Sequence, residues 1–180
     1  MRRKDVLKAM KKHNFDEHIR CQFEHIEKTD KGFHSRNIRF VEKMDELLTE
    51  EQRLLLWEYG GRCIGGETGK RSAKYEKELR GSLAEKVARL KEDNHMYKIE
   101  LNDDGTITAY CACHCLQWRL EEPEREVVRI KTPSAYGCSA GAAFHNIKKA
   151  LGINARIKSI DYPQEGDGIK YMPFVIEIID

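Results

Sequence analysis

The sequence has no long run of apolar residues. None of its segments approaches the roughly 20 consecutive apolar residues that a helix needs to cross a bilayer. The basic residues near the N-terminus are not followed by the apolar core of a secretory signal peptide. We therefore expect a soluble protein that stays in the cytoplasm and has no membrane partner.

The sequence also lacks an excess of charge of one sign. Its 32 Lys and Arg residues nearly balance its 30 Asp and Glu residues, which leaves a formal net charge of +2. The basic clusters Arg2-Arg3-Lys4 and Lys11-Lys12 are short and are typical of solvated helix faces. Nucleic acid is therefore not an expected partner.

Internal repeats and low-complexity segments are absent as well. A chain of 180 residues with 40% apolar and 34% charged residues is typical of one folded domain. We expect a single α+β domain over residues 1–180, with a helical part over residues 1–94 and a sheet with one helix over residues 95–180.

The helical part has apolar residues three or four positions apart, which is the spacing of amphipathic helices. One such pattern runs from Lys4 to Glu27 with a break at Asn14, and a shorter one covers residues 38–48. Thr49-Glu50-Glu51-Gln52 has the form of a capping box, in which the Thr hydroxyl accepts a backbone N–H and the Gln side chain reaches back. This motif predicts that a helix begins there.

Glycines interrupt the helical part further along. The four glycines between Gly60 and Gly66 predict a loop or a kink, because each glycine costs about 1 kcal/mol in a helix interior. The sequence of residues 65–72 also resembles a phosphate-binding loop. However, Ile64 stands where its first glycine is required and Arg71 replaces the magnesium-binding Ser or Thr, so no phosphate site is expected. A last helix is predicted from Ser82 to Asp93.

After residue 95 the apolar residues recur at every second position. They alternate with polar residues from Tyr97 to Leu101, residues 102–105 favour a hairpin turn, and a return strand is expected from Thr106 to Cys113. An amphipathic helix is predicted from Ser139 to Leu151, with Ser139 as its N-cap and Gly152 as its C-cap. Further strands are expected over residues 125–131, 155–160 and 171–178. This order predicts N-terminal helices packed on a mainly antiparallel sheet, with one helix inserted between the strands.

Three cysteines occur at alternate positions in the segment Cys111-Ala112-Cys113-His114-Cys115. In a cytoplasmic protein such cysteines are reduced thiols, metal ligands or catalytic groups rather than disulfides. In a regular strand the three thiols would lie on one face, about 6.6 Å apart, whereas two thiolates on one zinc ion lie only about 3.8 Å apart. A metal site therefore requires the strand to end or bulge here, or it takes ligands from elsewhere.

Cys138 is the other thiol of interest. It lies at the start of the predicted Ser139–Leu151 helix, where the free backbone N–H groups and the helix dipole stabilise a thiolate. Such a position suits a nucleophile or a metal ligand. Cys63, in the glycine-rich stretch, could join it, whereas Cys21 lies in a helical pattern and is expected in the core or on the surface.

Three functions stay open at this point. The first is a binding protein that holds a metal ion, preferably zinc, or a small ligand with its thiols. Its ligands would be Cys63, Cys111, Cys113, Cys115 and Cys138. The second is a thiol-dependent hydrolase in which Cys138 is the catalytic nucleophile and His114 the base. The third is a structural protein whose cysteines are buried and inert.

The last part of the chain, residues 136–180, also resembles a known family. Its motifs are Gly137-Cys138-Ser139-Ala140-Gly141, Leu151-Gly152-Ile153, Glu165-Gly166-Asp167 and Tyr171-Met172-Pro173-Phe174. Together with the strand over residues 155–160, they resemble the C-terminal part of 4-vinyl-reductase-type domains, a set that includes proteins similar to L-2-amino-thiazoline-4-carboxylate hydrolase. The resemblance implies several helices followed by an antiparallel sheet, a small hydrophobic ligand and a homodimer. It supplies no catalytic residue, and Tyr162-Pro163 stands where those domains carry cysteines near the final hairpin.

Overall fold

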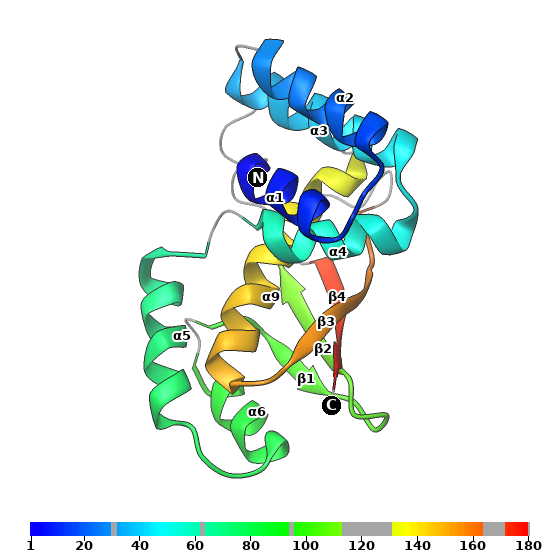
Figure 1. The fold of residues 1–180 in the computed structure, drawn as a ribbon. Coiled ribbons are helices and arrows are strands. Elements are labelled where there is room, and N and C mark those ends of the chain that lie inside the picture. The colour runs from blue at the N-terminus through cyan, green and yellow to red at the C-terminus, as the bar shows by residue number, and fades with distance from the viewer. Residues whose placement is uncertain (30–31, 62–63, 94–95, 113–130, 164–171, 180) are drawn as a thin grey trace.

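The computed structural model describes residues 1–29, 32–61, 64–93, 96–112, 131–163 and 172–179. In this part of the chain helices pack on an antiparallel sheet, so the predicted α+β fold is confirmed (Figure 1). The helices before the sheet are α1 (Arg3–Lys12), α2 (Glu17–Thr29), α3 (Phe33–Leu47), α4 (Glu50–Gly60), α5 (Gly66–Glu78) and α6 (Leu83–Lys91). The remaining elements are β1 (Ile99–Leu101), β2 (Ile107–Cys111), the short 3-10 helix η1 (Pro133–Tyr136), α9 (Gly137–Leu151), β3 (Ala155–Ile160) and β4 (Met172–Ile178).

The N-terminal helices follow the sequence signals closely. Asn14 has a left-handed φ of 55° and separates α1 from α2, which confirms the predicted break. The capping box at Thr49 is also confirmed, because the Thr49 hydroxyl accepts from the Gln52 N–H and the Gln52 side chain accepts from the Thr49 N–H. This cap begins α4, which packs against α1 on one side and against α9 and β3 on the other.

One helix was not anticipated from the sequence. Residues 66–78 form α5, which begins directly after the glycine-rich stretch and leads through Gly81 into α6. Figure 1 places α5 at the outside of the molecule, alongside α9. The Gly65–Ser72 segment is thus largely helical, and the sequence analysis had rejected it as a phosphate-binding loop.

The sheet has the strand order β1-β2-β4-β3, and its neighbouring strands are antiparallel. The predicted strand over residues 155–160 is confirmed with its bounds, and the predicted hairpin forms between β1 and β2. The return strand is shorter than predicted, since β2 ends at Cys111 and Ala112 lies outside it. The predicted strand over residues 125–131 lies outside the described residues except for Lys131, which is helical, so the prediction is wrong at that residue.

Helix α9 lies between β2 and β3 in sequence, and it packs on the sheet (Figure 1). It begins at Gly137 rather than after Ser139, so Ser139 is not its N-cap. The reason is that η1 runs directly into the helix and supplies the preceding turn. Gly152 ends the helix with a left-handed φ of 63°, which confirms the predicted C-cap.

A hydrophobic core joins the helices to the sheet. Along β2, Ile107, Ala109 and Cys111 are buried, and they lie opposite buried residues of β4. Phe144 and Ile147 of α9 belong to the same core. The core continues without a break to the N-terminal helices, where it includes residues such as Val6, Met10, Phe23, Phe40 and Trp57. No helix in the described ranges is long and apolar enough to span a membrane.

Candidate thiol site at the start of helix α9

The structure describes two of the five cysteines that the sequence analysis proposed as ligands. Cys111 is the last residue of β2 and is 1% exposed, and Cys138 is half-buried in the first turn of α9. Cys63, Cys113 and Cys115 lie outside the described residues, as does His114. Cys21, which was not proposed as a ligand, is exposed on α2.

Cys111 and Cys138 lie at the same end of the layer formed by α9 and the sheet. In Figure 1, β2 points towards α4 and runs opposite to α9, which begins near α4. Cys111 belongs to the hydrophobic core, and Cys138 packs against it. As predicted, the Cys111 side chain shares the buried face of β2 with Ile107 and Ala109.

The thiol of Cys138 faces the end of α4. Its Sγ lies 3.9 Å from the carbonyl oxygen of Gly60, and that oxygen also accepts the backbone N–H of Arg2 at 2.8 Å. A carbonyl oxygen can pair with a protonated thiol but not with a thiolate. Ligand binding at Cys138 would therefore have to replace the contact with Gly60.

Glycines let α4 and α9 approach closely beside this thiol. A Cβ on Gly141 would lie 2.0 Å from the carbonyl oxygen of Trp57, and a Cβ on Gly61 would lie 2.3 Å from the backbone nitrogen of Ala142. The Trp57 ring covers Gly137 in the same way, with its Nε1 2.3 Å from a Cβ built there. The chain around Gly60 and Gly61 is thus pressed against the first two turns of α9.

A group of polar side chains surrounds η1 next to this crossing. The Ser134 hydroxyl donates to the carboxylate of Asp45, and Arg53 Nε lies 3.6 Å from the same carboxylate. Tyr162, which follows β3, is partly buried near them. Partial burial raises the pKa of the Tyr162 hydroxyl, and the nearby Trp57 side chain opposes this increase. Its hydroxyl is therefore protonated across the physiological range.

Sequence reasoning did not find these polar residues. Asp45, Arg53, Ser134 and Tyr162 come from four separate segments, and none of them belongs to a motif. Only the packing of α3, α4 and η1 brings them together. In the sequence, Cys138 and the predicted family resemblance were the signals that pointed to this part of the molecule.

Among the described residues, no group of three or more His, Cys, Asp or Glu side chains is arranged to hold a metal ion. Of the proposed metal ligands, this part of the chain supplies Cys111 and Cys138 only. A tetrahedral zinc site needs four ligands. The other ligands of such a site would have to come from the segments that contain Cys63, Cys113 and Cys115.

Comparison with known proteins identifies no relative. No family model matches the chain, and neither a curated protein nor a solved structure does. The resemblance to 4-vinyl-reductase-type domains therefore stays a prediction.

Proposed function

We propose that the chain is a cytoplasmic binding protein whose thiols, at the end of β2 and the start of α9, hold a metal ion, with zinc preferred, or a small ligand. The observation that carries this proposal is the termination of β2 at Cys111, at the same end of the fold as Cys138. A continuous strand would have kept alternate thiols too far apart for one ion.

Chain connectivity supports the wider ligand set. Cys63 follows Gly61 by two residues in the sequence, and Gly61 is in contact with α9. Cys113 and Cys115 follow Cys111 in the same way. The segment with Cys63 and the segment with Cys113 and Cys115 thus both depart from positions near the start of α9. Zinc suits thiolate ligands better than magnesium or calcium does, because those ions prefer oxygen.

The small-ligand form of the proposal depends on the resemblance described above. It has separate support in the polar group around η1, where the Tyr162 hydroxyl and the Asp45–Arg53 pair would supply the few polar contacts that are typical of small-molecule sites.

Metal analysis of the full-length protein, purified without chelator, tests the metal form. We expect about one equivalent of zinc, and we expect Cys138→Ser and Cys111→Ser each to lower the metal content severely. Cys21→Ser is the matched control, because Cys21 is an exposed cysteine on a helix remote from α9. It should leave the metal content unchanged. Protein free of metal after reconstitution with zinc would contradict the proposal.

The hydrolase alternative has one observation in its favour, which is that Cys138 is partly accessible while Cys111 is buried. Rates of thiol alkylation separate it from the metal site. Rapid alkylation of Cys138 in metal-free protein, unaffected by added zinc, would favour the nucleophile. Slow alkylation of both Cys111 and Cys138 in protein that binds no metal would contradict the metal site and the nucleophile. It would support the structural role of buried cysteines.

A further inference from the structure

Helix α5 buries much less of its surface than α9, the helix against which it packs. All thirteen residues of α5 are described, and Ser72 is the buried one. Tyr75 and, just after the helix, Leu79 reach the core only partly. In α9, by contrast, most residues are buried, including Phe144, Ile147 and Leu151. Little apolar surface therefore leaves water when α5 docks against α9.

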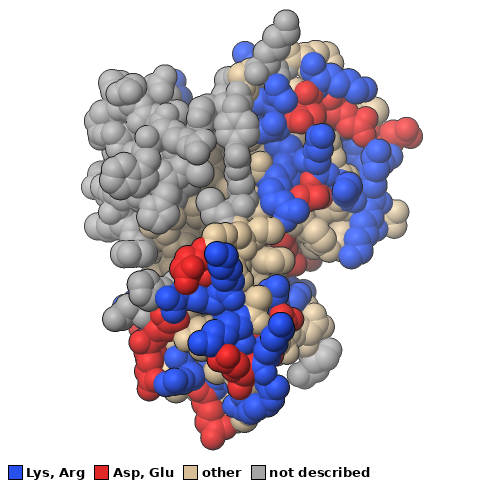
Figure 2. All heavy atoms as spheres, turned by 90° about the vertical axis from the view of Figure 1, so that its left-hand side faces the viewer, with Lys and Arg blue, Asp and Glu red and all other residues tan. Residues whose placement is uncertain are grey.

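The outer side of α5 is fully solvated. Figure 2 views the molecule from this side and shows Lys, Arg, Asp and Glu side chains intermixed over the lower half. The exposed residues of α5 include Lys70, Lys74, Glu76, Lys77 and Glu78. This helix is therefore polar on the outside and nearly free of apolar residues on the inside.

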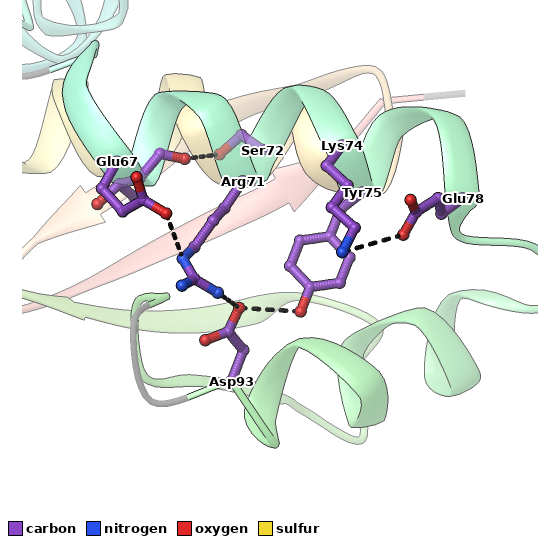
Figure 3. Close-up of polar contacts among 8 residues, drawn as sticks. Glu67, Arg71, Ser72, Lys74, Tyr75, Glu78 and Asp93 are labelled. Atoms are coloured by element: carbon purple, nitrogen blue, oxygen red, sulfur yellow. Dashed lines mark hydrogen bonds and ion pairs between the residues drawn. The ribbon is translucent and has the colours of Figure 1, made fainter.

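Figure 3 shows the polar contacts of α5. Asp93, just after α6, accepts from Arg71 Nη1 at 3.1 Å and from the Tyr75 hydroxyl at 2.9 Å. Its side chain is only 9% exposed. Within α5, Glu67 lies 3.2 Å from Arg71 Nε and helps to orient that side chain towards Asp93. The longer Glu76–Lys149 pair, at 3.9 Å, joins α5 directly to α9. Asp93 thus accepts hydrogen bonds from two side chains of α5.

The surface of α9 under α5 carries a polar group without a full set of partners. Asn146 is 1% exposed, and no donor of the described residues reaches its Oδ1. Its Nδ2 makes a long contact of 3.4 Å with the Tyr97 hydroxyl. The Oδ1 lies 4.0 Å from a Cβ built on Gly69, so it is next to α5. An unpaired buried oxygen penalises the docked arrangement, because water would satisfy it once α5 moved away.

Glycines with left-handed backbone stand at both ends of α5. Gly66 has φ +67° and Gly81 has φ +97°. Glycine adopts positive and negative φ values at little cost in free energy. The backbone at both positions can therefore change conformation when α5 moves. From these four features we infer that α5 is a releasable cover of α9. It undocks from α9 as a local opening while the sheet, α4 and α9 remain folded, and its release exposes the side of α9 that carries Asn146.

Amide hydrogen exchange of the full chain, followed by mass spectrometry, tests this inference. We expect the amides of residues 67–79 to exchange at least ~100-fold faster than those of the buried turns of α9, because local openings need less free energy than global unfolding. Asp93→Asn should accelerate exchange in α5 and leave α9 unchanged. Glu92→Gln is the matched control, since among the described residues Glu92 pairs with exposed Arg89, and it should change neither helix.

A second variant tests the role of the unpaired amide. Asn146→Leu removes the buried oxygen and adds apolar surface under α5, so it should slow exchange in α5. Equal exchange rates in α5 and α9 of the unmodified protein would overturn the inference. An equal acceleration of both helices by Asp93→Asn would overturn it as well, because that result indicates global unfolding.

Discussion

Glu58 is a carboxylate that α4 carries to the outer edge of the sheet. Its Oε1 accepts the backbone N–H of Ile157 at 2.8 Å, and β3 is an edge strand with an irregular register at this point. Burial raises the pKa of Glu58, while the hydrogen bond from Ile157 and the charges of Lys148 and Arg156 oppose the increase. The carboxylate thus supplies an acceptor to the edge strand of the sheet where α4 covers it, but its charge is disfavoured there.

The raised pKa predicts how Glu58 affects stability as a function of pH. The folded state holds the proton of Glu58 more tightly than the unfolded state, whose pKa lies near the ordinary value of 4.5. The contribution of Glu58 to stability is therefore largest below pH 4.5 and falls as the pH rises through the folded pKa. Glu58→Gln keeps the acceptor and removes the titration. Its stability relative to wild type should rise between about pH 4 and pH 8 in urea unfolding.

Glu51→Gln serves as the control for Glu58. Glu51 is an exposed carboxylate on the same helix, so this variant shows whether the loss of one charge alone accounts for the effect. If the stability difference between Glu58→Gln and wild type were the same at every pH, the account of Glu58 would be wrong.

At the scale of elements, the crossing of α4 and α9 is set by backbone contact. Gly141→Ala would place a Cβ 2.0 Å from the Trp57 carbonyl oxygen, and rigid backbone cannot move aside cheaply. We expect this variant to lose about 1–3 kcal/mol of stability or more, the usual range for overpacking. Gly65→Ala is the matched control, because a Cβ there meets nothing within 4 Å. Denaturant unfolding of both variants measures the difference, and equal stability would contradict the assignment of close packing.

The elements that the sequence predicted best are those with a clear apolar period. β3, the β1–β2 hairpin and the end of α9 at Gly152 all follow from alternation or capping signals. The start of α9 was misplaced, because η1 joins the helix without a side-chain cap. Helix α5 was missed for a physical reason. Its buried position is Ser72, so its inner face shows no apolar period.

The candidate site was predictable only in part. Cys138 could be found because it lies in the first turn of a helix with a clear apolar period, and Cys111 because it ends an alternating strand. Tyr162 and Asp45 could not, because their proximity depends on the packing of distant segments. Tertiary contacts of this kind leave no local pattern in a single sequence.

At the scale of the whole molecule, α4 connects the N-terminal helices to the sheet. It packs on α1, and it also packs on α9 and β3 (Figure 1). The hydrophobic core passes through Leu56 and Trp57 of α4 without interruption. A continuous core of this kind indicates that the two parts depend on each other.

We therefore expect the N-terminal helices and the sheet to unfold in one cooperative transition. Circular dichroism, which reports mainly on the helices, and the fluorescence of Trp57 in the core, measured in a Trp118→Phe variant, should give coincident curves. Early loss of α5 would have little effect on the fluorescence curve, because α5 contains no tryptophan, and it would remove only its thirteen residues from the helical signal. Two separated transitions would show instead that α1–α3 form an independent unit.

The place of β4 in the sheet bears on how the chain folds while it is being made. β4 is the last strand in the described sequence, yet it pairs with both β2 and β3. Neither pairing can form until the ribosome has released residues 172–178. Synthesis proceeds at about 5–20 residues per second. The apolar faces of β2 and α9 therefore stay without their contacts to β4 for about a second or more. During that interval the growing chain exposes surface that chaperones recognise, and the arrival of β4 ends that exposure.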